Sequence, residues 1–179
     1  MIGPFKDKTT INSNKENLTL CFWENVSCDI TQVMDMIHIE TVIGAPLEDV
    51  WSALIDFAHW SDWNPFVSKI KGEAKTGNRL ALKIFKKYTL HARLTEIVDK
   101  KILHFKGRGG PFGLLALNHT IELEPIDSES TRFTQTDTFS GWLAPIFFDL
   151  LEDHIKNGFE AMDTALKAHL EHSTEAKAV

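Results

Sequence analysis

Apolar residues recur every three or four positions in the segment that runs from Trp142 to about Leu170. This spacing places them along one side of a helix, with charged residues on the other side. Pro145 suits the first turn, where a backbone N–H has no helical partner. At 1.5 Å per residue, the helix would be roughly 37 Å long. Because its apolar side needs a covering surface, the pattern predicts a sheet in the preceding part of the chain.

Alternating apolar positions predict the strands of that sheet. In the first strand, which begins at Met36, residues Ile37, Ile39, Thr41 and Ile43 share one face. Further strands with turn residues between them are expected at 66–72, 79–85, 90–97, 102–108, 114–124 and 131–140. Two short helices are expected between the first two strands, the first of them opened by Pro46. The sequence therefore predicts a two-layer α+β domain, with a cavity wherever the sheet curves away from the long helix.

The turn at 98–101 sets which side chains of its two flanking strands face the helix. We expect the apolar residues Ala92, Leu94, Leu103 and Phe105 to point inward. The polar residues that alternate with them should face solvent, namely His91, Arg93, His104 and Lys106.

The chain of 179 residues is long enough for one domain with a full core. We expect residues 1–35 to form a partly flexible extension, 36–172 the folded domain and 173–179 a flexible tail. Within the extension, 18–23 is either a short strand or a segment that packs across the domain. The glycine-rich segment 107–113 lacks the features of a phosphate-binding loop, and we expect it to form a bend or a flap.

Charge and composition exclude several classes of function. The formal net charge of −6 argues against a nucleic-acid partner, and no apolar run is long enough for a transmembrane segment. The first residues lack the apolar core of a secretory signal, which favours a cytoplasmic protein. Cys21 and Cys28 lack metal-site spacing, so we expect reduced thiols, although a disulfide between them stays open. We expect neither a metal nor a cofactor.

The last predicted hairpin carries the candidate chemistry. If Leu123 pairs with Phe133 across the turn, His119 falls opposite Asp137 on the inward face. Opposed side chains have Cβ atoms about 4.5–5.5 Å apart, so an imidazole and a carboxylate would meet there. The pair has three interpretations: mutual satisfaction of buried polar groups, a polar anchor for a ligand, or a general acid/base pair.

Several segments resemble the START-like helix-grip (SRPBCC) superfamily, in its polyketide cyclase/dehydrase and lipid-transport-like branch. The resemblance covers about residues 36–170 and is carried by 39–46, 50–57, 60–66, 103–107, 131–133 and 139–141. It implies about seven antiparallel strands wrapped around the C-terminal helix, with an internal hydrophobic cavity. Members of this superfamily bind lipids, sterols, polyketides or quinones, and some are cyclases.

The resemblance and the apolar pattern together predict binding of a hydrophobic small molecule, such as a lipid, quinone or polyketide, for transport or sequestration. The side chains expected to line the cavity are Trp51, Trp60, Trp63, Phe66, Leu82, Leu94, Phe105, Leu117, His119, Gln135, Asp137, Phe139, Leu151, Ile155 and Phe159. Aromatic clusters such as these tryptophans more often belong to the core than to a ligand site. The alternatives are a cyclase/dehydratase-type enzyme that uses His119 and Asp137 as acid and base, or a protein-interaction module. The sequence leaves the ligand and the oligomeric state open.

Overall fold

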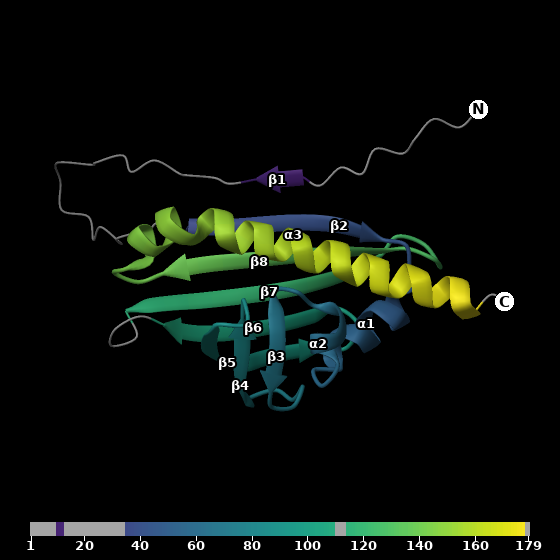
Figure 1. Cartoon of the computed structure of the whole chain (residues 1–179), viewed down its shortest axis with the longest axis horizontal. Coiled ribbons are helices and arrows are strands. Elements are labelled where there is room, and N and C mark those ends of the chain that lie inside the picture. The colour runs from purple at the N-terminus through teal and green to yellow at the C-terminus, as the bar shows by residue number, and fades with distance from the viewer. Residues whose placement is uncertain (1–9, 13–34, 110–113, 178–179) are drawn as a thin grey trace, which may run out of the picture.

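A curled antiparallel sheet and one long helix make up the two layers of the fold (Figure 1). The computed structural model describes residues 10–12, 35–109 and 114–177. The strand order is β1-β2-β8-β7-β6-β5-β4-β3, and every neighbouring pair is antiparallel. The strands are β1 (Thr10–Asn12), β2 (Asp35–Ile43), β3 (Val67–Lys71), β4 (Arg79–Ile84), β5 (Tyr88–Val98), β6 (Ile102–Gly109), β7 (Leu115–Pro125) and β8 (Thr131–Ser140).

Strands β2 to β8 are the seven strands that the sequence predicted. The short strand β1 adds an eighth, because Thr10 pairs with Glu40 and Asn12 with His38 at the outer edge of β2. The sequence did not predict this strand, and the partly flexible extension expected over residues 1–35 stays a prediction. The predictions for 18–23, Cys21 and Cys28 lie outside the described residues.

Three helices accompany the sheet among the described residues: α1 (Leu47–Ile55), α2 (Trp60–Trp63) and α3 (Ala144–Lys177). Pro46 immediately precedes α1, in the N-cap position, and Pro145 stands in the first turn of α3, as predicted. Helix α3 begins slightly later than expected and continues well beyond Leu170. Figure 1 shows α3 lying along the sheet, with α1 and α2 near its C-terminal half. No described helix is apolar enough over a sufficient length to cross a bilayer.

The core lies between the inner face of the sheet and α3. Alternation is clearest in β8, where each buried residue is followed by a half-buried one. The inward positions predicted for β5 and β6 are confirmed, since Ala92, Leu94, Leu103 and Phe105 are all buried. Strand β5 carries a bulge between Leu94 and Glu96, which adds to the curl of the sheet.

Candidate functional site

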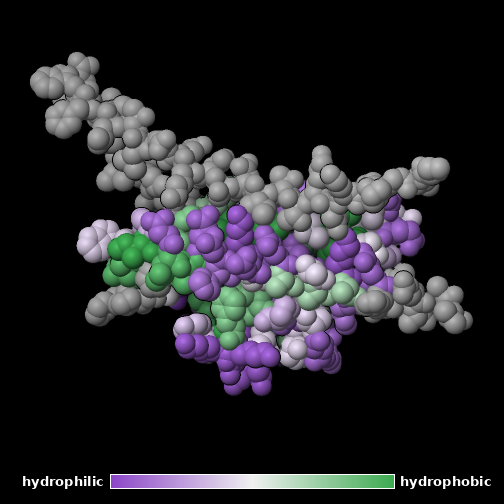
Figure 2. Space-filling model, turned by 45° about the horizontal axis from the view of Figure 1, so that its top comes forward, coloured by the Kyte–Doolittle hydropathy of each residue, from purple (hydrophilic) through white to green (hydrophobic). Residues whose placement is uncertain are grey.

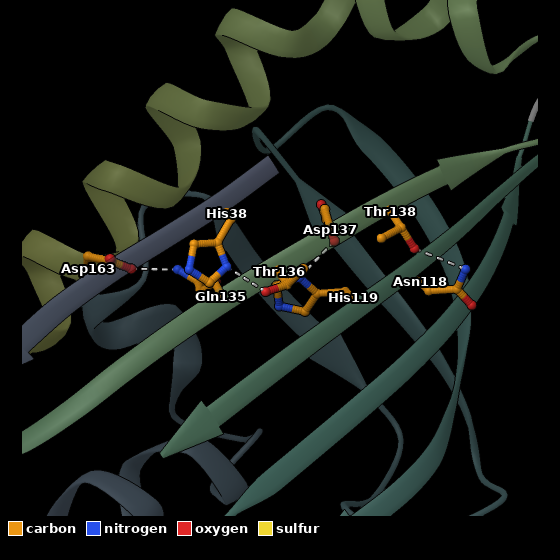
Figure 3. A network of polar contacts seen from close by, with 8 residues as sticks. All are labelled: His38, Asn118, His119, Gln135, Thr136, Asp137, Thr138 and Asp163. Atoms are coloured by element: carbon orange, nitrogen blue, oxygen red, sulfur yellow. Dashed lines mark hydrogen bonds and ion pairs between the residues drawn. The ribbon is translucent and has the colours of Figure 1, made fainter. Parts of the chain in front are cut away.

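The hairpin of β7 and β8 has the predicted register. Leu123 pairs with Phe133, and His119 pairs with Asp137. The Nδ1 atom of His119 lies 2.8 Å from Oδ1 of Asp137, within hydrogen-bond distance (Figure 3). Adjacent antiparallel strands therefore place an imidazole and a carboxylate in contact on the inner face of the sheet.

Aromatic rings surround this pair. The ring centroid of His119 lies 5.7 Å from that of Phe105 on β6 and 5.2 Å from that of Phe159 on α3. The His119 side chain keeps 17% of its surface exposed, whereas that of Asp137 keeps 4%. The carboxylate is thus enclosed, and the imidazole is the more accessible group of the pair.

The contact with Asp137 determines what His119 can do. When Nδ1 carries the proton, its N–H donates a hydrogen bond to the carboxylate, and the lone pair of Nε2 is left available. Among the described residues, none forms a hydrogen bond with Nε2 of His119. The pair therefore presents one oriented polar atom that can accept a hydrogen bond or a proton from a bound molecule.

A second polar group joins α3 to the sheet. Gln135 of β8 donates through Nε2 to Oδ1 of Asp163, and Thr41 of β2 donates to Oδ2 at 2.6 Å. Asp163 is only 3% exposed. Burial raises the pKa of its carboxyl to about 6, against the opposing effect of the hydrogen bonds from Thr41 and Gln135. Within the described part of the chain, Oε1 of Gln135 is buried without a partner.

Asp163 was not predicted as a site residue, since the charged residues of this segment were expected on the side of the helix away from the apolar row. A signal was present, because Asp163 follows Phe159 by four residues and precedes Leu166 by three. These steps place it on the buried side of α3. A charged residue in that position indicates a buried polar contact with the facing sheet.

The inner face is less enclosed toward the N-terminal half of α3. Among the predicted cavity residues, Leu82, Leu117, Leu151 and Ile155 are half-buried, whereas Phe105, Gln135, Phe139 and Phe159 are buried. Leu94 is fully buried. The inner face is therefore least enclosed around these half-buried apolar side chains. The predicted flap overlaps 110–113, which lies outside the described residues.

The structure places the three predicted cavity tryptophans in the core. Nε1 of Trp60 donates to the carbonyl oxygen of Leu54 at 3.0 Å, and the ring of Trp63 stacks on His169 of α3. Trp51 is also buried, and Phe66 packs edge-on against Phe159. The tryptophans belong to the end of the fold where α1 and α2 meet the C-terminal half of α3. Their contact with a ligand remains a prediction.

The first turns of α3 carry an exposed apolar row. Trp142 just before the helix, and Ile146 and Leu150 within it, are exposed by 85%, 66% and 70%. Figure 2 shows hydrophobic atoms at the surface where α3 begins. The protein-interaction hypothesis requires such a surface, and its use by a partner remains a prediction.

In the described part of the chain, no group of three or more His, Cys, Asp or Glu residues could hold a metal ion.

Comparison with protein families identifies the fold family. The model of the family described as "Polyketide cyclase / dehydrase and lipid transport" matches residues 35–171. The chain belongs to this family. It also has the helix-grip fold that the sequence analysis predicted. No curated protein matches its sequence.

Solved structures with the same fold include several enzymes. The Zhui aromatase/cyclase from Streptomyces sp. R1128 has a TM-score of 0.66 at 16% identity, covering 79% of this chain and 96% of that one. Norcoclaurine synthase from Thalictrum flavum, a point mutant in complex with a transition-state analogue, has a TM-score of 0.63 at 16% identity, with 80% and 98% covered. A hypothetical protein from Helicobacter pylori has a TM-score of 0.65 at 19% identity, with 88% and 99% covered. At these identities the likeness is one of fold.

Proposed function

We propose that this protein binds a hydrophobic small molecule, such as a lipid, quinone or polyketide, between the sheet and the N-terminal half of α3. The observation that carries the proposal is the His119–Asp137 pair. Its hydrogen bond leaves Nε2 of His119 without a partner among the described residues, beside apolar side chains that are only half-buried. A largely apolar wall with one oriented polar atom is typical of small-molecule sites.

The apolar wall and the polar atom of His119 contribute differently to the binding free energy. Burial of apolar ligand surface contributes about 25 cal/mol per Å² and supplies most of the affinity. The hydrogen bond to Nε2 of His119 would fix the orientation of one polar group on the ligand, and Asp137 holds the imidazole in place. The family description, which includes lipid transport, supports a ligand of this class.

The proposal can be tested by native mass spectrometry of the freshly purified protein, followed by denaturing extraction of any bound molecule. The extracted compound is then titrated into the wild-type protein and into His119→Gln. We expect weaker binding by about tenfold, the effect of one hydrogen bond to a charged or strongly polar group. His154→Gln is the matched control, because His154 is an exposed histidine of α3. Equal affinity in all three proteins would contradict the role of His119.

A cyclase- or dehydratase-type reaction is the second candidate, and the same residue pair favours it. In that case His119 acts as the acid/base and Asp137 orients it. The aromatase/cyclase and norcoclaurine synthase structures support this candidate through the shared fold. The two functions differ in the effect of His119→Gln: catalysis predicts loss of turnover with near-normal binding, whereas binding alone predicts reduced affinity.

A further inference from the structure

The outer face of the sheet carries a row of cations on three neighbouring strands. Arg79 of β4 pairs in register with Arg93 of β5, and Arg93 pairs with Lys106 of β6. All three side chains are exposed. Strands lie about 4.8 Å apart, so the three Cα atoms span roughly 10 Å. Directly opposed like charges destabilise a sheet, and this row contains two such pairs.

No acidic residue of the described chain neutralises the row. Arg79, Arg93 and Lys106 contribute to a surface hollow of about 950 Å³, which Arg108 and His91 also line, and no Asp or Glu is among its lining residues. Among the described residues, no carboxylate forms an ion pair with any of the four cations. We call these four residues and the space between them the basic hollow.

The other half of the same face is arranged differently. There, Arg132 of β8 pairs with Glu40 of β2 and with Glu124 of β7. Charges on that half therefore compensate one another, as is usual on a stable surface. The whole chain carries a formal charge of −6, so a general excess of basic residues does not explain the basic hollow. An arrangement that costs stability without local compensation is expected at a functional position.

We propose that the basic hollow binds a short acidic segment of a partner protein through its carboxylates. Arginine guanidinium groups match carboxylates with two parallel hydrogen bonds. Asn118, which pairs in register with Lys106, adds a neutral hydrogen-bonding group at the edge of the hollow. The cations occupy only three strands, a length that suits a short segment.

The same observations disfavour other polyanions. Single-stranded nucleic acid binds through aromatic rings on which bases stack, and no aromatic residue other than His91 lines the hollow. A long polyanion would continue across the sheet toward Glu122 and Glu124, which face the same side. A flat membrane surface would not enter the basic hollow, because the hollow is concave. An acidic peptide segment avoids each of these conflicts.

The test is fluorescence anisotropy of a labelled deca-glutamate peptide with the full chain at low ionic strength. We expect saturable binding that weakens as salt is added, because the contacts are exposed ion pairs. Arg79→Gln combined with Lys106→Gln should weaken binding by about tenfold, the combined effect of two exposed ion pairs. The control is Lys86→Gln with Lys87→Gln, which removes the same charge from the exposed turn between β4 and β5. Equal loss in both double variants, or no binding by the wild type, would overturn the proposal.

Two further measurements separate this proposal from its competitors. Poly(U) RNA and vesicles containing phosphatidylserine are titrated under the same conditions, and tighter binding of either at the basic hollow would overturn the choice of an acidic protein. Lys106→Gln should raise the thermal unfolding midpoint, because it removes one cation from an opposed pair. A lower midpoint would show that the row serves the fold, and the proposal would then fail. Binding of the extracted hydrophobic ligand should be unchanged in all these variants, which keeps this test independent of the interior site.

Discussion

Gly158 of α3 lies against the ring of Phe66: a β-carbon placed on Gly158 would stand 2.4 Å from Cδ2 of that ring. Phe66 immediately precedes β3 and also packs edge-on against Phe159 and Phe85. Because Gly158 has no side chain, β3 at the edge of the sheet can approach the middle of α3. This contact holds the edge of the sheet against α3.

Gly158→Ala tests this contact. Alanine favours a helix over glycine by about 1 kcal/mol, but overpacking in a core costs about 1–3 kcal/mol. We expect the overpacking to dominate, because the β-carbon meets several atoms of one rigid ring, and the free energy of unfolding should fall by about 1 kcal/mol. Urea denaturation measures the change. Combining Gly158→Ala with Phe66→Leu should recover part of the lost stability. If Gly158→Ala alone is as stable as the wild type, the ring of Phe66 moves aside easily.

The buried Asp163 makes stability depend on pH. Its pKa is raised from 3.8 to about 6 in the folded protein, so folding favours the protonated carboxyl. The stabilisation is complete below about pH 4 and is lost as the pH rises through about 6. A shift of about two pKa units corresponds to about 3 kcal/mol.

Asp163→Asn removes this titration and keeps a group that can bond to both Thr41 and Gln135. We expect the free energy of unfolding of Asp163→Asn, minus that of the wild type, to increase by up to about 3 kcal/mol between pH 4 and pH 8. Urea denaturation at several pH values gives this difference, in which the other titrating groups cancel. A difference that is constant across the range would mean that Asp163 has an ordinary pKa.

The local patterns in the sequence were sufficient for most of the fold. In strands with one polar face, apolar and polar residues alternate clearly. The short turn between β7 and β8 limits the register of these two strands, so the position of His119 opposite Asp137 was predictable. Pro46 and Pro145 marked the helix starts for a simple steric reason. These features depend on neighbours along the chain.

The features that were not predicted depend on distant contacts. The burial of Asp163 on α3 is possible only because Thr41 of β2 and Gln135 of β8 donate hydrogen bonds to it. The outward direction of Arg93 and Lys106 was predicted, but the alignment of Arg79 with Arg93 depends on the β4–β5 turn. In that turn Phe85 and Lys86 adopt positive φ values of 50° and 57°, which cannot be predicted from the residue types Phe and Lys.

Trp60→Phe distinguishes core packing from ligand contact. Nε1 of Trp60 donates to the carbonyl of Leu54, and the ring is buried. Phenylalanine cannot make this bond, so we expect a loss of about 1–3 kcal/mol in the free energy of unfolding, with unchanged affinity for the extracted ligand. Thermal denaturation and ligand titration measure the two quantities. Reduced affinity with unchanged stability would instead place Trp60 in the cavity, as the sequence had suggested.

The His119–Asp137 contact should appear as a coupling energy in a double-mutant cycle. His119→Phe approximately keeps the shape of a ring that packs between Phe105 and Phe159, but it leaves the enclosed carboxylate of Asp137 without its partner. Asp137→Leu removes that carboxylate, so the double variant should be more stable than the two single losses predict. We expect a coupling of about 1–3 kcal/mol by urea denaturation, as for hydrogen bonds to charged groups.

Asn118 and Thr138 provide the matched control for this cycle. They occupy the next positions on the same two strands, face the outer side and form a 3.3 Å hydrogen bond between neutral groups. Their coupling should be at most about 1 kcal/mol, because the bond is longer and joins two neutral groups. If the two couplings are equal, His119 and Asp137 act as an ordinary cross-strand pair. A clearly larger value for His119 and Asp137 would show that the carboxylate holds the imidazole, which both the binding and the catalytic function require.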